Sequence, residues 1–130
     1  MTLFVDSSGI LALVDRDDPA HAGVVEAFTL GRSEALSTHA YVIVKTLAVA
    51  RRRYGPVVTA DLIDRVIPAL DVAPVDTALH VASVAAFRDT VESSVSLVDR
   101  TSFAFMRREG IGRAIALDAD FRTAGFETLP

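Results

Sequence analysis

The sequence predicts an α/β domain in which a central, mostly parallel sheet of four to five short strands carries helices on both faces. Three observations predict this fold class. Short β-rich runs alternate with longer stretches whose apolar residues recur at helical spacing. No internal repeat or linker divides the 130 residues, so we expect one domain over residues 1–130. Three of the apolar runs end in an aspartate. Open α/β sheets bring such side chains together at the carboxyl ends of their strands.

The first half of the chain alternates strands and helices. Residues 2–5 form a β-rich run, and the apolar stretch Gly9–Val14 follows as a helix. An Asp-Asp-Pro break separates it from a second helix, His21–Leu30. Glu34–Ser37 is a very short strand candidate. The next helix is expected over about His39–Arg53 and ends near a Gly-Pro pair.

The second half repeats this alternation. A helix is expected over Thr59–Ile67, because apolar residues recur at helical spacing and a proline marks its end. Asp71–Val75 is a strand candidate, which its proline confines to a strand end. Thr77–Val91 and Thr101–Glu109 are predicted helices, and glycine closes the second. Arg113–Asp118 is predicted as a buried strand, with a turn and a short helix or loop after it.

Composition excludes several classes of protein. The chain has no cysteine, which rules out thiol catalysis, disulfides and thiolate zinc sites. Its amino terminus lacks the basic region of a signal peptide, and no apolar run is long enough to cross a bilayer. We therefore expect a cytoplasmic protein with no membrane partner. The formal net charge of −4 argues against nonspecific binding of polyanions over the whole surface.

Three aspartates form the candidate site. Asp6, Asp99 and Asp118 end the runs LFVD, SLVD and AIALD, which we interpret as strands that deliver carboxylates to one crevice. Carboxylates gathered without cations repel one another, so they indicate a bound hard cation such as Mg²⁺ or Mn²⁺. Each aspartate alone also fits a helix cap or a turn. Because Asp120 follows two residues after Asp118, either of the two could be the last acid of the site.

Four blocks of the sequence resemble a known family in order and spacing. They read VDSSGILALVDRDDPAH, STHAYVIVKTLAVARRRYG, SLVDRTSFAFMRREGI and RAIALDADFRTAGF. Together they cover nearly the whole chain and resemble the blocks of PIN-domain ribonucleases, most closely the VapC-like toxins of bacterial type II toxin–antitoxin pairs. The resemblance implies a three-layer PIN-like fold and cleavage of RNA with Mg²⁺ or Mn²⁺ and no covalent intermediate.

The resemblance also implies roles for particular residues. Asp6 matches the first metal-binding acid of the family, Asp99 the third and Asp118 the fourth, with Asp120 as the alternative to Asp118. These acids would be catalytic because they would hold the metal. The positions where the family keeps supporting hydroxyls are Ser7, Ser8, Thr101 and Ser102. A small cognate antitoxin and a homodimer are implied as well.

Lys45 departs from the family pattern. It is the only lysine of the chain and stands where the second acid, a glutamate, is expected. At 4 Å and an effective dielectric of about 20, one ion pair amounts to roughly 4 kcal/mol, so a change of two charge units would weaken metal binding. We expect impaired ribonuclease activity in this form. A natural degenerate member and an introduced inactivating change both fit the sequence.

Two further interpretations stay open at this stage. The run Arg51, Arg52 and Arg53 fits local contacts to RNA phosphates, and it fits equally a solvated helix end. The alternative function is a catalytically inactive PIN-fold binding module that engages antitoxin or RNA without cleavage. An aspartyl-phosphate phosphatase is disfavoured, because serine follows two residues after Asp6 where that chemistry needs a second aspartate.

Overall fold

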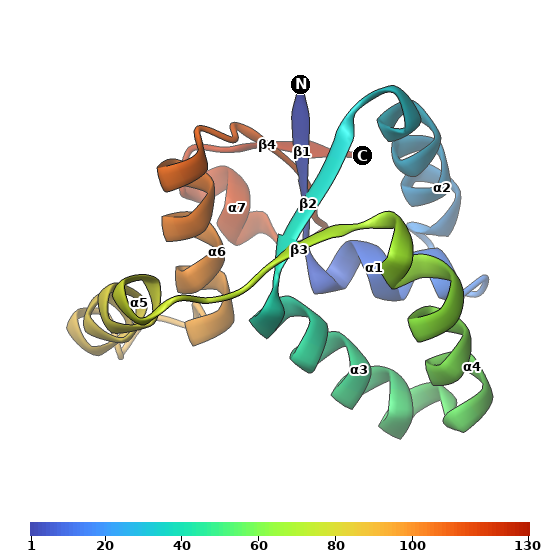
Figure 1. Cartoon of the computed structure of the whole chain (residues 1–130), viewed down its shortest axis with the longest axis horizontal. Helices are drawn as coiled ribbons and strands as arrows, with labels where there is room; N and C mark the ends of the chain where they lie inside the picture. The colour runs from blue at the N-terminus through green and yellow to red at the C-terminus, as the bar shows by residue number, and fades with distance from the viewer.

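The computed structural model describes residues 1–130 and contains one five-stranded sheet (Figure 1). The strand order is β3-β2-β1-β4-β5, and every pair is parallel. The strands are β1 Thr2–Val5, β2 Ala35–His39, β3 Asp71–Ala73, β4 Arg113–Ile115 and β5 Glu127–Leu129. The predicted α/β class with a parallel sheet is therefore confirmed. The last strand, β5, lies where a turn and a short helix or loop were expected.

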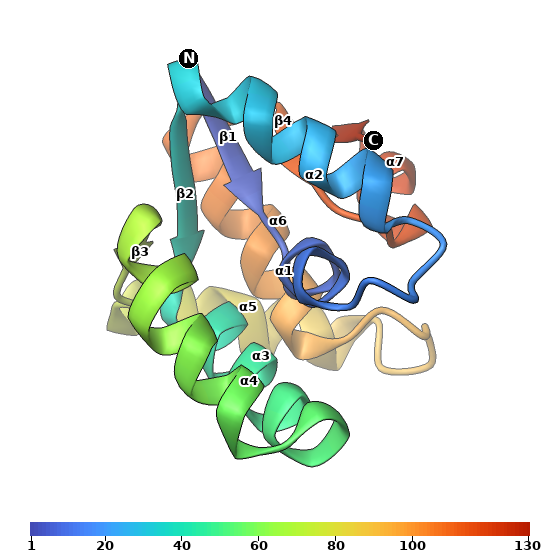
Figure 2. The same cartoon turned by 90° about the vertical axis from the view of Figure 1, so that its right-hand side faces the viewer.

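Helices cover both faces of the sheet. They are α1 Ser7–Val14, α2 His21–Leu30, α3 Ala40–Tyr54, α4 Pro56–Asp61, α5 Thr77–Asp89, α6 Leu97–Glu109 and α7 Ala119–Thr123. Figures 1 and 2 show α2 and α6 on opposite sides of β1 and β2. The helix expected over Thr59–Ile67 begins earlier, at Pro56, and widens into a π-helical turn over Leu62–Val66. No helix combines the length and apolar character that a membrane span requires.

Strand β1 lies at the centre because it is apolar on both faces. Leu3, Phe4 and Val5 are all buried, as expected for a strand with parallel neighbours and helices on either side. The ring of Phe4 contacts Phe105 of α6 at 5.9 Å and Phe121 of α7 at 6.1 Å between centroids. This core fixes α6 and α7 against the middle of the sheet, so the side chains at their amino ends have defined positions.

The prediction of a strand ending at Asp99 is wrong. The run is the first turn of α6, which begins at Leu97 rather than at Thr101. Ser96 is the cap, and its hydroxyl oxygen accepts a hydrogen bond from the Asp99 backbone N–H at 3.1 Å. This bond satisfies one of the free N–H groups of the first turn, which offsets the β-preference of Val98.

The sheet brings distant segments together at its carboxyl edge. Val5 pairs with Ile115 in the parallel register of β1 and β4. The backbone N–H of Asp6 then donates to the carbonyl oxygen of Ile115 at 3.0 Å. Asp6 and the segment that carries Asp118 therefore leave the sheet side by side, at the edge where α1 and α3 also begin (Figure 1).

Candidate metal centre

Asp6 is a buried carboxylate at the start of α1. It caps that helix, and its Oδ2 accepts hydrogen bonds from the backbone N–H of Ser8 at 3.2 Å and from the Ser8 hydroxyl at 2.6 Å. Its other oxygen, Oδ1, is buried and has no hydrogen-bond partner. A buried carboxylate oxygen without a partner is costly. It is therefore an open ligand position for a cation.

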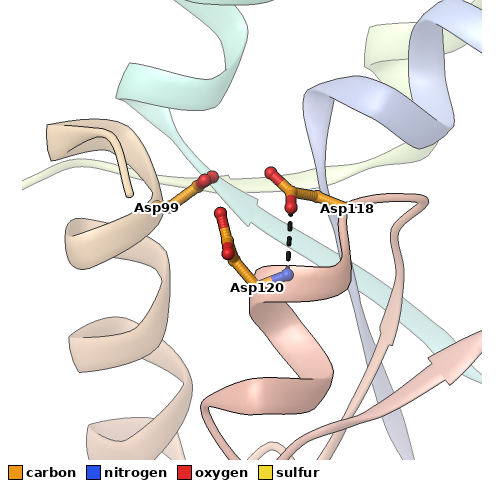
Figure 3. A group of neighbouring side chains, drawn as sticks. All are labelled: Asp99, Asp118 and Asp120. Carbon is orange, nitrogen blue, oxygen red and sulfur yellow. Dashed lines mark hydrogen bonds between the residues drawn. The ribbon is translucent and has the colours of Figure 1, made fainter. Parts of the chain in front are cut away.

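Three further carboxylates lie close together beside it. Asp99 comes from α6, whereas Asp118 caps α7 and Asp120 lies in its first turn. Each offers one oxygen, and these oxygens lie within 4.8 Å of one another (Figure 3). Asp118 Oδ1 also accepts the backbone N–H of Asp120 at 3.0 Å. Asp118 and Asp120, the two acids considered for the carboxyl-terminal position of the site, are therefore both part of this cluster.

Asp6 is not one of the three acids whose oxygens lie within 4.8 Å of one another, but its charge acts on Asp99. Burial, together with the charges of Asp6 and Asp118, raises the pKa of Asp99 to about 7. Burial also raises the pKa of Asp6, against the hydrogen bonds from Ser8. Partial desolvation and the Asp118 carboxylate raise the pKa of Asp120, whereas the Arg100 guanidinium opposes the shift. The acids thus repel one another, and a divalent cation would relieve that repulsion.

The donor set fits a hard metal ion. Carboxylate oxygens are the ligands that Mg²⁺ and Mn²⁺ prefer, and no histidine or cysteine is part of the cluster. The unpartnered Oδ1 of Asp6 supplies an independent indication, because it has no protein donor to satisfy it. Asp99, Asp118 and Asp120 are therefore the residues that could hold the ion together, and the free Oδ1 of Asp6 is a further candidate ligand beside them.

Lys45 lies within electrostatic reach of these acids. It is half-buried in α3. Burial raises the pKa of both Asp6 and Asp99, and the Lys45 ammonium acts in the opposite direction on each of them. No carboxylate oxygen lies within 4.0 Å of the Lys45 ammonium, so its charge acts on the acids over a longer distance than in an ion pair. The positive charge of the lysine therefore partly offsets the rise in the pKa of two of the acids.

The four predicted supporting hydroxyls differ in what they contact. Ser8 alone hydrogen-bonds one of the acids, Asp6. Ser7 is buried next to it, and its backbone N–H slightly opposes the rise that burial causes in the pKa of the Asp6 carboxyl. The Thr101 hydroxyl donates to the Leu97 carbonyl oxygen at 2.9 Å. The Ser102 hydroxyl donates to a carbonyl oxygen one turn earlier in α6. The last two hydroxyls are thus engaged with their own helix.

The predicted arginine run lies away from the cluster. Arg51, Arg52 and Arg53 are exposed in the last turn of α3, where cations favour the negative end of the helix dipole. The structure instead places Arg100 of α6 beside the acids, through its effect on Asp120. Sequence reasoning missed Arg100. Its one signal is that it directly follows Asp99 at the start of a helix.

Comparison with known proteins identifies the family. Residues 3–127 match the PIN domain. The chain therefore belongs to the PIN-domain family, which confirms the resemblance of its sequence blocks.

Within that family the chain is VapC-like. It is 33% identical over 133 residues to the 23S rRNA-specific endonuclease VapC20 of Mycobacterium tuberculosis, covering 95% of each chain. The crystal structure of that protein, described as a sarcin–ricin loop cleaving toxin, is similar with a TM-score of 0.82 and 32% identity, covering 98% of this chain and 99% of that one.

Two more distant structures share the fold. FitAcB from Neisseria gonorrhoeae gives a TM-score of 0.75 at 13% identity and covers 100% of this chain and 97% of that one. The structure of VapBC2 from Rickettsia felis, bound to a promoter DNA fragment, has a TM-score of 0.76 and 8% identity. The match covers 100% of both chains. At these identities the likeness concerns the fold alone.

Proposed function

We propose that this protein is a Mg²⁺- or Mn²⁺-dependent endoribonuclease toxin of a toxin–antitoxin system, impaired in this form by Lys45. The observation that carries the proposal is the cluster of Asp99, Asp118 and Asp120 at the carboxyl edge of the sheet, with Asp6 near enough for its charge to act on Asp99 and with a buried, unpartnered oxygen on Asp6. The likeness to VapC20 supports 23S ribosomal RNA as the first substrate to test.

Each acid has a distinct part in this proposal. Asp6 is held in one orientation by Ser8 and offers its free Oδ1 to the ion. Without an ion the pKa of Asp99 is about 7, so an ion that binds below that pH must displace its proton. Asp118 is fixed as the cap of α7. A bound ion would polarise the scissile phosphate and lower the pKa of an attacking water.

Lys45 accounts for the impairment. Its ammonium already neutralises part of the negative charge around Asp6 and Asp99. Relative to a glutamate at that position, the local charge is two units more positive, which reduces the free energy gained when a divalent cation binds. The remaining acids are therefore expected to bind Mn²⁺ weakly.

A second candidate function follows from the same lysine. In this alternative the protein is an inactive binding module that engages antitoxin or RNA without cleavage, and Lys45 replaces the metal as the counter-charge of the acids. The effect of its ammonium on both Asp6 and Asp99 favours this candidate. Under either function the proposed partners are a small cognate antitoxin, RNA and a second copy of the chain, in the cytoplasm.

The test compares three proteins on an RNA hairpin that carries the sarcin–ricin loop. We expect slow Mn²⁺-dependent cleavage by the unaltered protein, at least tenfold faster cleavage by Lys45→Glu, and none by Lys45→Glu/Asp99→Asn. Calorimetric titration with Mn²⁺ should show tighter binding by Lys45→Glu. The impairment proposal fails if Lys45→Glu changes neither quantity. If Lys45→Glu binds Mn²⁺ more tightly and still leaves this RNA and total RNA uncut, the binding-module alternative is favoured.

A further inference from the structure

A surface pocket between α6 and α7 adjoins the acidic cluster. Its volume is about 290 Å³, and Arg100, Arg107 and Asp120 lie on its wall. Asp120 is also one of the three acids whose oxygens lie within 4.8 Å of one another. The pocket and the candidate metal centre therefore share a wall, and a ligand that extends beyond the metal centre on this side enters the pocket.

The pocket is lined by two arginines that lack a carboxylate partner. No carboxylate oxygen lies within 4.0 Å of Arg100 or Arg107, whereas Arg65, Arg108 and Arg113 all form ion pairs. The Nε atom of Arg100 is buried and has no hydrogen-bond partner. An unpaired buried donor on a cation is costly, so an anion that accepts its hydrogen bond would be favoured there.

The second arginine is held in position by uncharged groups. The Nη2 atom of Arg107 donates to the Ala124 carbonyl oxygen at 3.0 Å, and its guanidinium lies 5.3 Å from the centroid of the Phe126 ring. The two arginines stand about two helical turns apart on α6, which places them on one face. The Arg100 guanidinium also opposes the rise in the pKa of Asp120 on the same wall, but neither arginine forms an ion pair, so both can contact a single extended anion.

We propose that this pocket binds a phosphate of the RNA strand, adjacent to the phosphate at the acidic cluster. The inference rests on the proposed function for the identity of the ligand. Each nucleotide carries one phosphate, so a strand that presents a phosphate to the metal centre must also place its neighbours around it. A guanidinium fork matches phosphate oxygens in charge and geometry. Arg100 and Arg107 would thus position the strand, whereas the acids act on the bond that is cut.

The test measures RNA binding in EDTA, where cleavage does not occur. A fluorescent hairpin with the sarcin–ricin loop is titrated with the unaltered protein, Arg100→Gln, Arg107→Gln and a control, Arg88→Gln. Arg88 is exposed at the end of α5 and does not line the pocket, and its substitution removes the same charge. We expect about tenfold weaker binding by Arg100→Gln and a salt-dependence slope lower by about one. Arg107→Gln should behave similarly, and Arg88→Gln should change affinity less than twofold.

Several outcomes would overturn the inference. Equal affinity and equal salt slope for Arg100→Gln and Arg88→Gln would do so, provided that all variants keep the melting temperature of the parent. Absence of any salt-dependent RNA binding by the parent protein would also overturn it. Because the assay contains no divalent ion, a protein that fails to cut RNA still gives a clear result, so failure of the pocket and failure of the nuclease activity are distinguishable.

The class of anion is tested separately. The Arg100 Nε–H signal in NMR spectra is followed during titration with inorganic phosphate and, in parallel, with acetate. A larger shift at lower concentration with phosphate is expected. A preference for acetate would contradict the RNA assignment and indicate a carboxylate from a protein partner.

Discussion

The hydroxyl of Ser8 donates a hydrogen bond to Oδ2 of Asp6, with 2.6 Å between the two oxygens. The same hydroxyl oxygen accepts the backbone N–H of Leu117 at 3.0 Å. One serine therefore joins the first acid, at the end of β1, to the segment that follows β4 and leads into Asp118. This side chain therefore adds to the backbone hydrogen bond from Asp6 to Ile115 in fixing the relative positions of two candidate metal ligands.

Replacement of Ser8 by alanine should weaken the metal centre. Asp6 would lose a donor that stabilises its ionised form, and the Leu117 N–H would lose its acceptor. We expect a loss of about 1 kcal/mol in the free energy of unfolding and several-fold weaker Mn²⁺ binding. Ser33→Ala is the matched control, because the Ser33 hydroxyl is exposed and donates only to a nearby carbonyl oxygen. Equal Mn²⁺ affinity of the two variants would contradict this role of Ser8.

Stability without metal should depend on the ionisation of Asp99. Its pKa is about 7 in the folded protein, raised by burial and by the charges of Asp6 and Asp118 from an ordinary value of 3.8. A raised pKa means that the folded state binds the proton more tightly than the unfolded state. The contribution of Asp99 to stability is therefore fully present below about pH 3.8 and is lost as the pH rises through 7.

Urea unfolding in EDTA at several pH values measures this effect. Asp99→Asn should remove that decrease in stability, so the difference between variant and parent should grow as the pH rises from 4 to 7. Addition of Mn²⁺ to the parent should restore stability mainly above pH 7, where the carboxylate is ionised. Parallel pH profiles for parent and variant would contradict the raised pKa.

His39 should produce a pH dependence of the opposite sign. Burial lowers its pKa to about 4. Because the Ser102 hydroxyl donates to a backbone carbonyl, it accepts from His39 Nε2 at 2.9 Å, and His39 is neutral. The contribution of a neutral buried histidine is lost as the pH falls from 6.5 to 4, by at most about 3 kcal/mol. His39→Gln, unfolded in urea at pH 7 and pH 5, should show a smaller loss between these pH values than the parent.

Gly9 should be intolerant of a side chain. A Cβ atom at this position would lie 2.8 Å from the carbonyl oxygen of Ile115, so α1 would have to move away from β4. We expect Gly9→Ala to destabilise the protein by about 1–3 kcal/mol and to weaken Mn²⁺ binding, because Asp6 moves with α1. Gly112→Ala is the control, since nothing lies within 4 Å of a Cβ there. Similar melting temperatures for the two variants would show that this close contact is unimportant.

The sequence was most informative where short-range chemistry decides the structure. An apolar run followed by an aspartate predicted the position of Asp6, because a central strand of a parallel sheet must be apolar throughout and its polar successor lies at the edge. The same pattern predicted a strand over Arg113–Asp118, but β4 ends at Ile115 and Asp118 caps α7 three residues later. The family blocks singled out Lys45, whose charge the structure places within reach of two acids.

Asp99 shows the limit of this approach. The run SLVD has the composition of a strand, yet it opens a helix because Ser96 caps the backbone N–H of Asp99. Serine followed three residues later by an acid is a known signal of a helix start, but the β-preference of Val95 and Val98 favoured the strand interpretation. The pocket around Arg100 could not be predicted, since it depends on how α7 packs against α6.

The parallel arrangement of the sheet has a consequence for the timing of folding. Ser8 and Leu117, which one hydrogen bond joins, are 109 positions apart in the chain. No pair of neighbouring strands is connected by a tight turn, so β1 has no complete set of neighbours until β4 has been synthesised. Such long-range pairing slows folding. A ribosome making this protein therefore carries a nascent chain that lacks the assembled acids for almost the whole of translation.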